Sequence, residues 1–174
     1  MKTKTTSNPV PLLRGLFTSL LAIAAFFGAP AALLAQTLYV STDGGPIDKV
    51  DSTGAVSLFA TMPGGSAPQG LAFDGSGNLY AANVYANQIS KITPGGAVSF
   101  FATVSTPGGL AFDGNGNLYA ADFVDGQIDI ITPAGAVSLF ATLPGGSFPT
   151  GLAFDSSGNL YAADASNGQA MSPA

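Results

Sequence analysis

One fourteen-residue segment recurs three times in this chain and restricts the folds available to it. It reads GLAFDGNGNLYAAD at 109–122, and closely related segments occupy 70–83 and 151–164. Each copy holds two short apolar runs separated by a polar, glycine-containing turn. Asp113 suits a type I turn because its carboxylate can accept from the turn's own amides, and Gly116 suits the positive-φ residue that follows. The segment therefore predicts a β-hairpin, and its recurrence predicts a repeated unit.

The repeats begin at Gly70, Gly109 and Gly151, which are 39 and 42 residues apart. Two further apolar runs follow each hairpin and show no helical periodicity, so a complete unit is expected to hold four short strands. These strands carry large and small apolar residues on both faces, as sheets packed on both sides require. We therefore expect an all-β chain of four-stranded propeller-type blades. The expected blades are 36–69 (partial), 70–108, 109–150 and 151–174 (partial).

This region is too short to close a ring. Residues 36–174 correspond to about 3.4 units of about 41 residues, whereas propellers close with about four to eight blades. We expect an open arc of about three to four blades with thirteen strands, in which the first blade lacks its inner strand and the last lacks its outer two. Its terminal sheets would expose apolar faces and unpaired edges. We therefore expect self-association or missing blades to complete the propeller, with residues 152–154 of one copy completing the first blade of another.

Residues 1–35 have the three-part layout of a secretory signal peptide, here called the leader. The layout consists of basic Lys2, Lys4 and Arg14, an apolar run at 16–27 and small residues at 28–35. It predicts an N-terminal signal helix, cleavage after Ala35 (with Ala31 as the other candidate) and a secreted or periplasmic protein without membrane contact after cleavage. The alternative is an N-terminal membrane anchor, because residues 16–35 are about long enough to cross a hydrocarbon core.

Charged residues are distributed unevenly between the leader and the repeats. Residues 36–174 hold two basic side chains, Lys49 and Lys91, against all ten acidic ones, which gives a net charge of −8. Such a charge repels phosphate-rich partners, so nucleic acid is not an expected partner. The chain has no His, and residues 36–174 have no Glu or Arg. This composition excludes Ser-His-Asp catalysis and His-ligated metals.

The repeated sequence motifs resemble those of a known family. GLAFDxxGNLYAAD, followed by xxxGQI and then TPxGAV, is similar to the NHL repeat and to the related propellers of the gluconolactonase (regucalcin-like) and virginiamycin B lyase families. The resemblance implies where the sites of those enzymes lie. In the gluconolactonase-like family, a metal-binding Asn or Asp precedes the Gly-Leu that opens the inner strand, and in the lyase-like family a His stands at that position. This chain has Gln69, Gly108 and Thr150 there. None of them is a good ligand for a divalent metal, so no catalytic or metal-binding residue is assigned.

Two other sets of polar residues are candidates for a site. Asn83, Asp122 and Asp164 share one repeat position where the second strand ends, so we expect them on a common rim of the propeller. There they would bond the amides of the loops that they open, or else form a ring that binds cations or sugars. Asp113-x-Asn115-x-Asn117 imitates the start of an EF-hand loop, but Leu118 stands where the loop needs Gly. We therefore expect a hairpin turn there rather than a calcium site.

The function predicted from the sequence is an exported, non-catalytic β-propeller module that serves as a binding or structural platform for a protein or carbohydrate. The candidate rim positions are Asn83, Asp122, Asp164, Gln69 and Thr150. No cofactor is expected, with calcium or another divalent metal as the alternative. Two other readings stay open: a partial or degenerate metal-dependent lactonase- or lyase-like enzyme, and a truncated fragment of a longer propeller protein.

Overall fold

The computed structural model describes residues 37–42, 45–166 and 169–171, and within them the chain is entirely β-structure and turns. The strands form four antiparallel sheets that follow one another along the chain. The predicted signal helix and the alternative membrane anchor lie outside the described residues. Among the described residues, no helix has the length and apolar character needed to cross a membrane.

Each sheet is a meander in which consecutive strands pair. Sheet 1 contains β1 (Leu38–Ser41), β2 (Pro46–Val50) and β3 (Val56–Thr61). Sheet 2 contains β4 (Pro68–Phe73), β5 (Leu79–Asn83), β6 (Gln88–Ile92) and β7 (Val98–Thr103). Sheet 3 contains β8 (Pro107–Phe112), β9 (Leu118–Asp122), β10 (Gln127–Ile131) and β11 (Val137–Thr142). Sheet 4 contains β12 (Pro149–Phe154), β13 (Leu160–Asp164) and β14 (Gln169–Met171).

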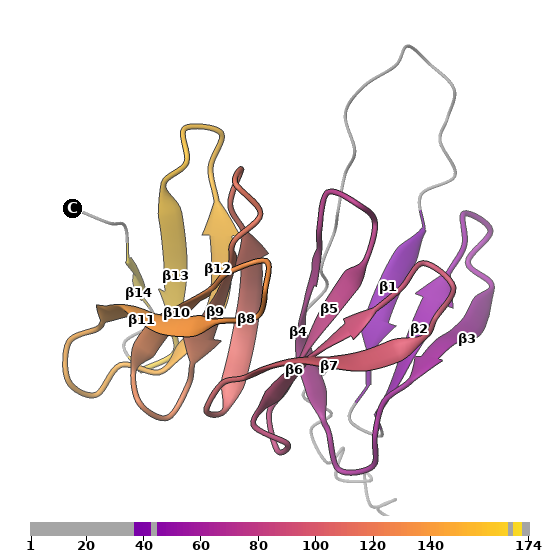
Figure 1. Cartoon of the computed structure of the whole chain (residues 1–174), viewed down its shortest axis with the longest axis horizontal. Helices are drawn as coiled ribbons and strands as arrows, with labels where there is room; N and C mark the ends of the chain where they lie inside the picture. Colours follow the sequence, from indigo (N-terminus) through magenta and orange to yellow (C-terminus); the bar gives the residue numbers. More distant parts are fainter. Residues whose placement is uncertain (1–36, 43–44, 167–168, 172–174) are drawn as a thin grey trace, which may run out of the picture.

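The four sheets are not closed into a ring. Sheet 1 and sheet 4 lie at opposite ends of the arrangement, and the innermost strands β4, β8 and β12 lie near its middle (Figure 1). The expected all-β open arc is thus present. The expected count of thirteen strands is wrong, because sheet 4 has a third strand, β14, which pairs with β13. Residues 152–154 lie in β12, which pairs with β13 of its own sheet.

The predicted hairpin turn is confirmed in the repeated segment. In the turn between β8 and β9, one carboxylate oxygen of Asp113 accepts from the amides of Asn115 and Asn117, at 2.9 and 2.8 Å. Gly116 has a φ of 85°, a left-handed conformation that favours glycine. Folding lowers the pKa of Asp113, because these bonds and one from the Asn117 side chain outweigh the opposing effect of burial.

Apolar side chains fill the space between successive sheets, so that each internal sheet is packed on both faces. The core between sheets 2 and 3 includes Tyr80 and Ile89 from one side and Leu118 and Ile131 from the other. The same kind of core lies between sheets 1 and 2 and between sheets 3 and 4. These cores explain why the strands carry apolar residues on both faces.

One aromatic arrangement repeats at all three junctions. The Tyr of β1, β5 or β9 packs edge-on against a Phe of its sheet's outermost strand and against a Phe of the next sheet's innermost strand. The three sets are Tyr39 with Phe59 and Phe73, Tyr80 with Phe101 and Phe112, and Tyr119 with Phe140 and Phe154. Tyr39 of β1 therefore plays the part that Tyr80 plays in β5, so β1 corresponds to the second strand of a complete blade.

Candidate functional site

Asn83, Asp122 and Asp164 occupy the last positions of β5, β9 and β13, as expected from their shared repeat position. All three side chains are buried. The three side chains therefore do not form a solvent-exposed acidic ring. Each side chain instead contacts the loops and strands beside it, and the three do so in different ways.

Asp164 holds two chain segments together at the start of sheet 4. Its Oδ1 accepts hydrogen bonds from the Phe148 amide at 3.0 Å and from the amide and hydroxyl of Ser166 at 2.9 and 2.7 Å. The Ser166 hydroxyl and these amides stabilise the carboxylate and so hold the pKa of Asp164 well below its usual range. The side chain acts as an ionised clamp between the connection that enters β12 and the loop that leaves β13.

Asp122 occupies the same position in sheet 3, but its pKa shifts in the opposite direction. Its Oδ1 accepts from the Thr106 hydroxyl and the Asp125 amide, both at 3.1 Å. Burial, together with the negative charge of Asp125, nevertheless raises its pKa. The pKa of Asp129 is raised as well, first by burial and then by the charges of Asp122 and Asp125. Asp122, Asp125 and Asp129 thus lie together in this part of sheet 3, where burial and neighbouring negative charge raise the pKa of Asp122 and of Asp129.

Asn83, the equivalent residue of sheet 2, has a polar atom without a partner. Its Nδ2 donates to the Ser90 hydroxyl at 2.8 Å, while its buried Oδ1 receives no hydrogen bond from any described residue. Ser90 also lies in the floor of an open groove of about 430 Å³ between the end of β3 and sheet 2. The groove is lined by Thr61, Met62, Pro63, Gln88, Ser90, Val98, Ser99 and Phe100. It contains no charged side chain, so it offers little to fix a ligand.

The positions that precede Gly-Leu lie on the innermost strands β4, β8 and β12. Gln69 and Thr150 are exposed, whereas Gly108 is buried between their strands. The Thr150 hydroxyl donates to the Ala163 carbonyl at 3.3 Å, and the Gln69 carbonyl accepts from the Ser41 hydroxyl at 3.1 Å. Within the described ranges, no group of three or more His, Cys, Asp or Glu side chains is arranged to hold a metal ion.

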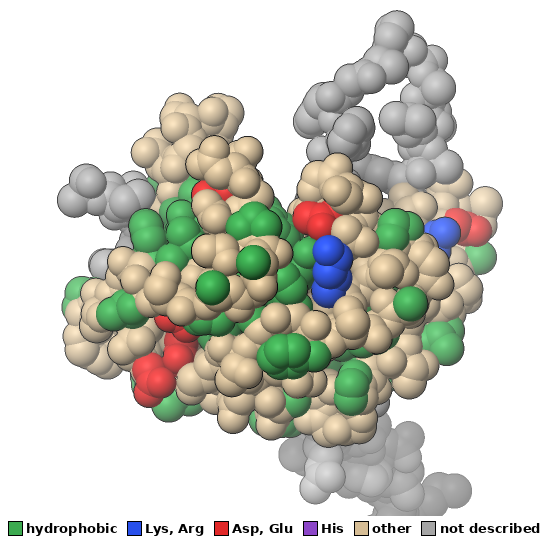
Figure 2. Space-filling view, viewed as in Figure 1, with side chains coloured by type: hydrophobic (Ala, Val, Ile, Leu, Met, Phe, Trp, Pro, Cys, Tyr) green, Lys and Arg blue, Asp and Glu red, His purple; other side chains and the backbone are tan. Residues whose placement is uncertain are grey.

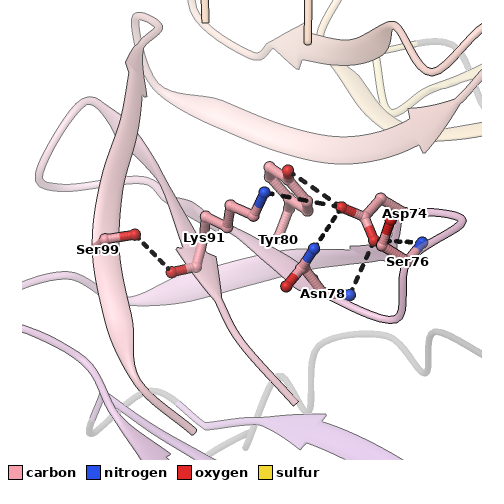
Figure 3. A network of polar contacts seen from close by, with 6 residues as sticks. All are labelled: Asp74, Ser76, Asn78, Tyr80, Lys91 and Ser99. Carbon is pink, nitrogen blue, oxygen red and sulfur yellow. Dashed lines mark hydrogen bonds and ion pairs between the residues drawn. The ribbon is translucent and has the colours of Figure 1, made fainter. Parts of the chain in front are cut away.

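The EF-hand-like segments use their polar atoms within the turn. Asp74, the counterpart of Asp113, accepts from the Ser76 and Asn78 amides through Oδ1 and from the Asn78 side chain and the Tyr80 hydroxyl through Oδ2 (Figure 3). The Lys91 ammonium lies 3.9 Å from the same Oδ2. In Asp113 the second oxygen likewise accepts from the Asn117 side chain at 2.8 Å. Both carboxylates are thus engaged inside their hairpins.

An apolar patch on the same rim was missed by the sequence reasoning. The rings of Phe123, after β9, and Phe148, before β12, lie 5.2 Å apart and so bridge sheets 3 and 4. Both are exposed, as are Val124 beside Phe123 and Tyr85 in the loop between β5 and β6, which is 80% exposed. The signal available in the sequence was the placement of large apolar residues in turns, where hairpin geometry does not require them. We call Tyr85, Phe123, Val124 and Phe148 the rim patch.

The loops that carry the rim patch are tied to one another. Thr106, in the connection between β7 and β8, links two of them: its amide donates to the Asn87 side chain at 2.9 Å, its hydroxyl to Asp122, and its carbonyl accepts from the Phe123 amide at 3.2 Å. Phe148 is fixed in a similar way, because its carbonyl accepts from the Ala165 amide at 3.0 Å. These bonds set the positions of exposed aromatic rings before any partner binds.

Comparisons with known proteins agree with the fold. The structure is similar to a catalytically inactive virginiamycin B lyase from Staphylococcus aureus with quinupristin, with a TM-score of 0.71 and 17% identity over 92% of this chain and 56% of that one. It is also similar to regucalcin, a calcium-binding protein from Agrobacterium tumefaciens, with a TM-score of 0.60 and 19% identity over 73% of this chain and 49% of that one. A chain of a nidogen/laminin complex gives a TM-score of 0.64 and 21% identity over 72% of this chain and 52% of that one.

These likenesses show a β-propeller fold, and the chain spans about half the length of the solved structures that it matches. No protein-family model and no curated protein sequence matched it.

Proposed function

We propose that this protein is an exported, non-catalytic propeller module that binds a protein partner through its rim patch. The observation that carries the proposal is the exposed Phe123–Phe148 pair, which bridges two sheets on loops that hydrogen bonds already fix. Exposed aromatic residues supply large contact area, and pre-ordered loops lose little conformational entropy on binding. The rim therefore has the properties of a binding surface.

The charge beside the rim patch supports a basic partner. Asp125 is exposed next to Val124, and Asp122 and Asp129 lie behind it. The whole chain carries ten acidic side chains against five basic ones. A partner that presents Lys or Arg around an apolar centre would complement both the acidic groups and the aromatic rings.

The positions before Gly-Leu support a non-catalytic role. An enzyme of the lactonase or lyase type would need metal ligands or a general base close to the propeller axis. Gln69 and Thr150 offer neither, and Gly108 has no side chain.

An array of short peptides tests the binding function directly. The purified full chain should bind Lys- or Arg-containing peptides that carry an aromatic residue, and Phe123→Ser, Phe148→Ser and Asp125→Asn should each weaken this binding. Phe100→Ser is the control, because Phe100 is also an exposed Phe but lies on the outer strand β7. Binding confined to a parallel glycan array would favour a carbohydrate ligand. If Phe100→Ser weakened peptide binding as much as the rim-patch variants do, the rim patch would not be the binding surface.

A further inference from the structure

The three internal junctions are built from the same two faces. A sheet turns one face toward the next sheet in the chain, here called its forward face, and the other toward the preceding sheet, its rear face. The forward face of sheet 3 presents Tyr119 and Ala121, which pack against Ala162 and Leu152 on the rear face of sheet 4. The junctions between sheets 1 and 2 and between sheets 2 and 3 repeat this arrangement.

The forward face of sheet 4 lacks this cover. Tyr161 is 37% exposed, whereas its counterparts Tyr119 and Tyr80 are 8% and 4% exposed. Ala163 is exposed as well, although its counterpart Ala121 is fully buried. Within the described part of the chain, no aromatic ring packs on Tyr161. The forward face of sheet 4 thus carries the same kinds of residue as the faces that form the internal junctions, but no further sheet of the described chain packs on it.

The rear face of sheet 1 is the other half of such a junction. Leu38, Val40 and Val50 are only partly buried there. Their counterparts in sheet 3, Leu118, Ala120 and Ile131, are all 1% exposed or less. Hydrophobic side chains also reach the surface over both halves of the molecule in the view of Figure 2.

We infer that the forward face of sheet 4 is a docking surface for the rear face of sheet 1 of a second copy of this chain. The two faces lie at opposite ends of one copy (Figure 1), so they cannot meet within it. A second copy brings the same two faces, and two head-to-tail junctions close a ring. Because one copy spans about half of the solved propellers it resembles, two copies supply about the length of one ring.

This pairing stacks sheets face to face and leaves every strand in its own sheet. Strand exchange, in contrast, would add β12, which pairs with β13 in its own sheet, to sheet 1 of the other copy. The inference is independent of the rim patch, because Tyr161 and Ala163 lie on the face of sheet 4 rather than in the rim loops.

Cysteine cross-linking tests the contact, and the chain contains no native Cys to interfere. In the junction between sheets 3 and 4, Ala121 and Ala162 belong to one core cluster. Their counterparts across the inferred junction are Ala163 of one copy and Val40 of the other. A mixture of full chains carrying Ala163→Cys and Val40→Cys should give a covalent dimer with a short bismaleimide. Either variant alone should give little covalent dimer.

The association state of the full chain without cross-linker is the second measurement. Sedimentation over a concentration series should show a monomer that converts to a dimer and no further. Ala163→Arg should raise the dissociation constant of the dimer at least about tenfold, whereas Ala134→Arg, in the exposed turn between β10 and β11, should leave it unchanged. A monodisperse monomer at high concentration, growth beyond two copies, or cross-linking of Ala163→Cys to itself would each overturn the inference.

Discussion

Gly109 of β8 lies so close to Gly151 of β12 that a Cβ atom on Gly109 would come within 2.7 Å of the Gly151 Cα. It would also meet the Thr150 carbonyl oxygen and the Leu152 amide nitrogen at 2.7 and 2.8 Å. All of these are backbone atoms, which cannot rotate away as a side chain can. The innermost strands of neighbouring sheets therefore touch through their backbones at this point, and the approach requires glycine.

Gly109→Ala should therefore destabilise the fold, by about 1 to 3 kcal/mol or more, because β8 and β12 must move apart to admit the methyl group. Gly108→Ala is the matched control: its Cβ would meet no atom closer than 3.5 Å, which is ordinary contact. Urea unfolding of the two variants measures the difference. Equal stability of both variants would contradict the close approach.

Asp122 and Asp164 share a repeat position, but their replacement should have different costs. Asp164→Ala removes an acceptor from three donors and eliminates a carboxylate that the fold favours, so it should lower the Tm strongly. Asp122→Ala leaves two donors without their acceptor, at a cost on the order of 1 to 3 kcal/mol, but relieves repulsion with Asp125 and Asp129. Thermal melts at neutral pH should rank Asp164→Ala as the less stable variant, and the reverse order would be inconsistent with this account.

The acidic group on sheet 3 predicts a pH dependence of stability. Folding raises the pKa of Asp129, so the folded state disfavours its carboxylate. This penalty is present above the raised pKa and disappears as the pH falls through it. Asp129→Asn should therefore be more stable than the wild type at pH 7, and the gain should shrink as the pH is lowered toward 4. Denaturant midpoints for both proteins across this range measure the trend, and a gain that grows on acidification would refute it.

The turn aspartates predict that calcium does not stabilise the protein. Both oxygens of Asp113 already accept hydrogen bonds, and the Asn117 side chain presents its amino group to that carboxylate. Melting temperatures with calcium, with magnesium and with a chelator should agree. A rise of several degrees in calcium that Asp113→Asn abolishes would instead identify the turn as a cation site.

The leader predicts processing on export. The order of basic, apolar and small residues in 1–35 should direct cleavage, and the mature protein should begin within a few residues of Ala32 or Gln36. N-terminal sequencing of the protein from a soluble extracellular or periplasmic fraction tests this. Recovery of an intact residue 1–35 segment in the membrane fraction would indicate the anchor instead.

Much of the fold could be predicted because its determinants are local. A hairpin turn needs an acceptor at Asp113 and a positive φ at Gly116, and both requirements are met within five residues. The repeat spacing then implies a series of like sheets, and apolar residues on both strand faces imply that the sheets stack. Only the short strand β14 was missed, because Ala170 stands where the third strands β6 and β10 carry Ile89 and Ile128.

The sequence by itself determined which residues repeat, and therefore which positions are equivalent. Only the tertiary structure decided what those equivalent positions do, because burial and one hydrogen-bond partner of each come from segments farther along the chain, Thr106 for Asp122 and Phe148 for Asp164. Thr106 and Asp125 surround Asp122, whereas Phe148 and Ser166 surround Asp164, so one repeat position carries two opposite pKa shifts. The pairing of Phe123 with Phe148 likewise depends on how sheets 3 and 4 stack. Packing between segments far apart in the chain sets burial and charge, and no local pattern encodes it.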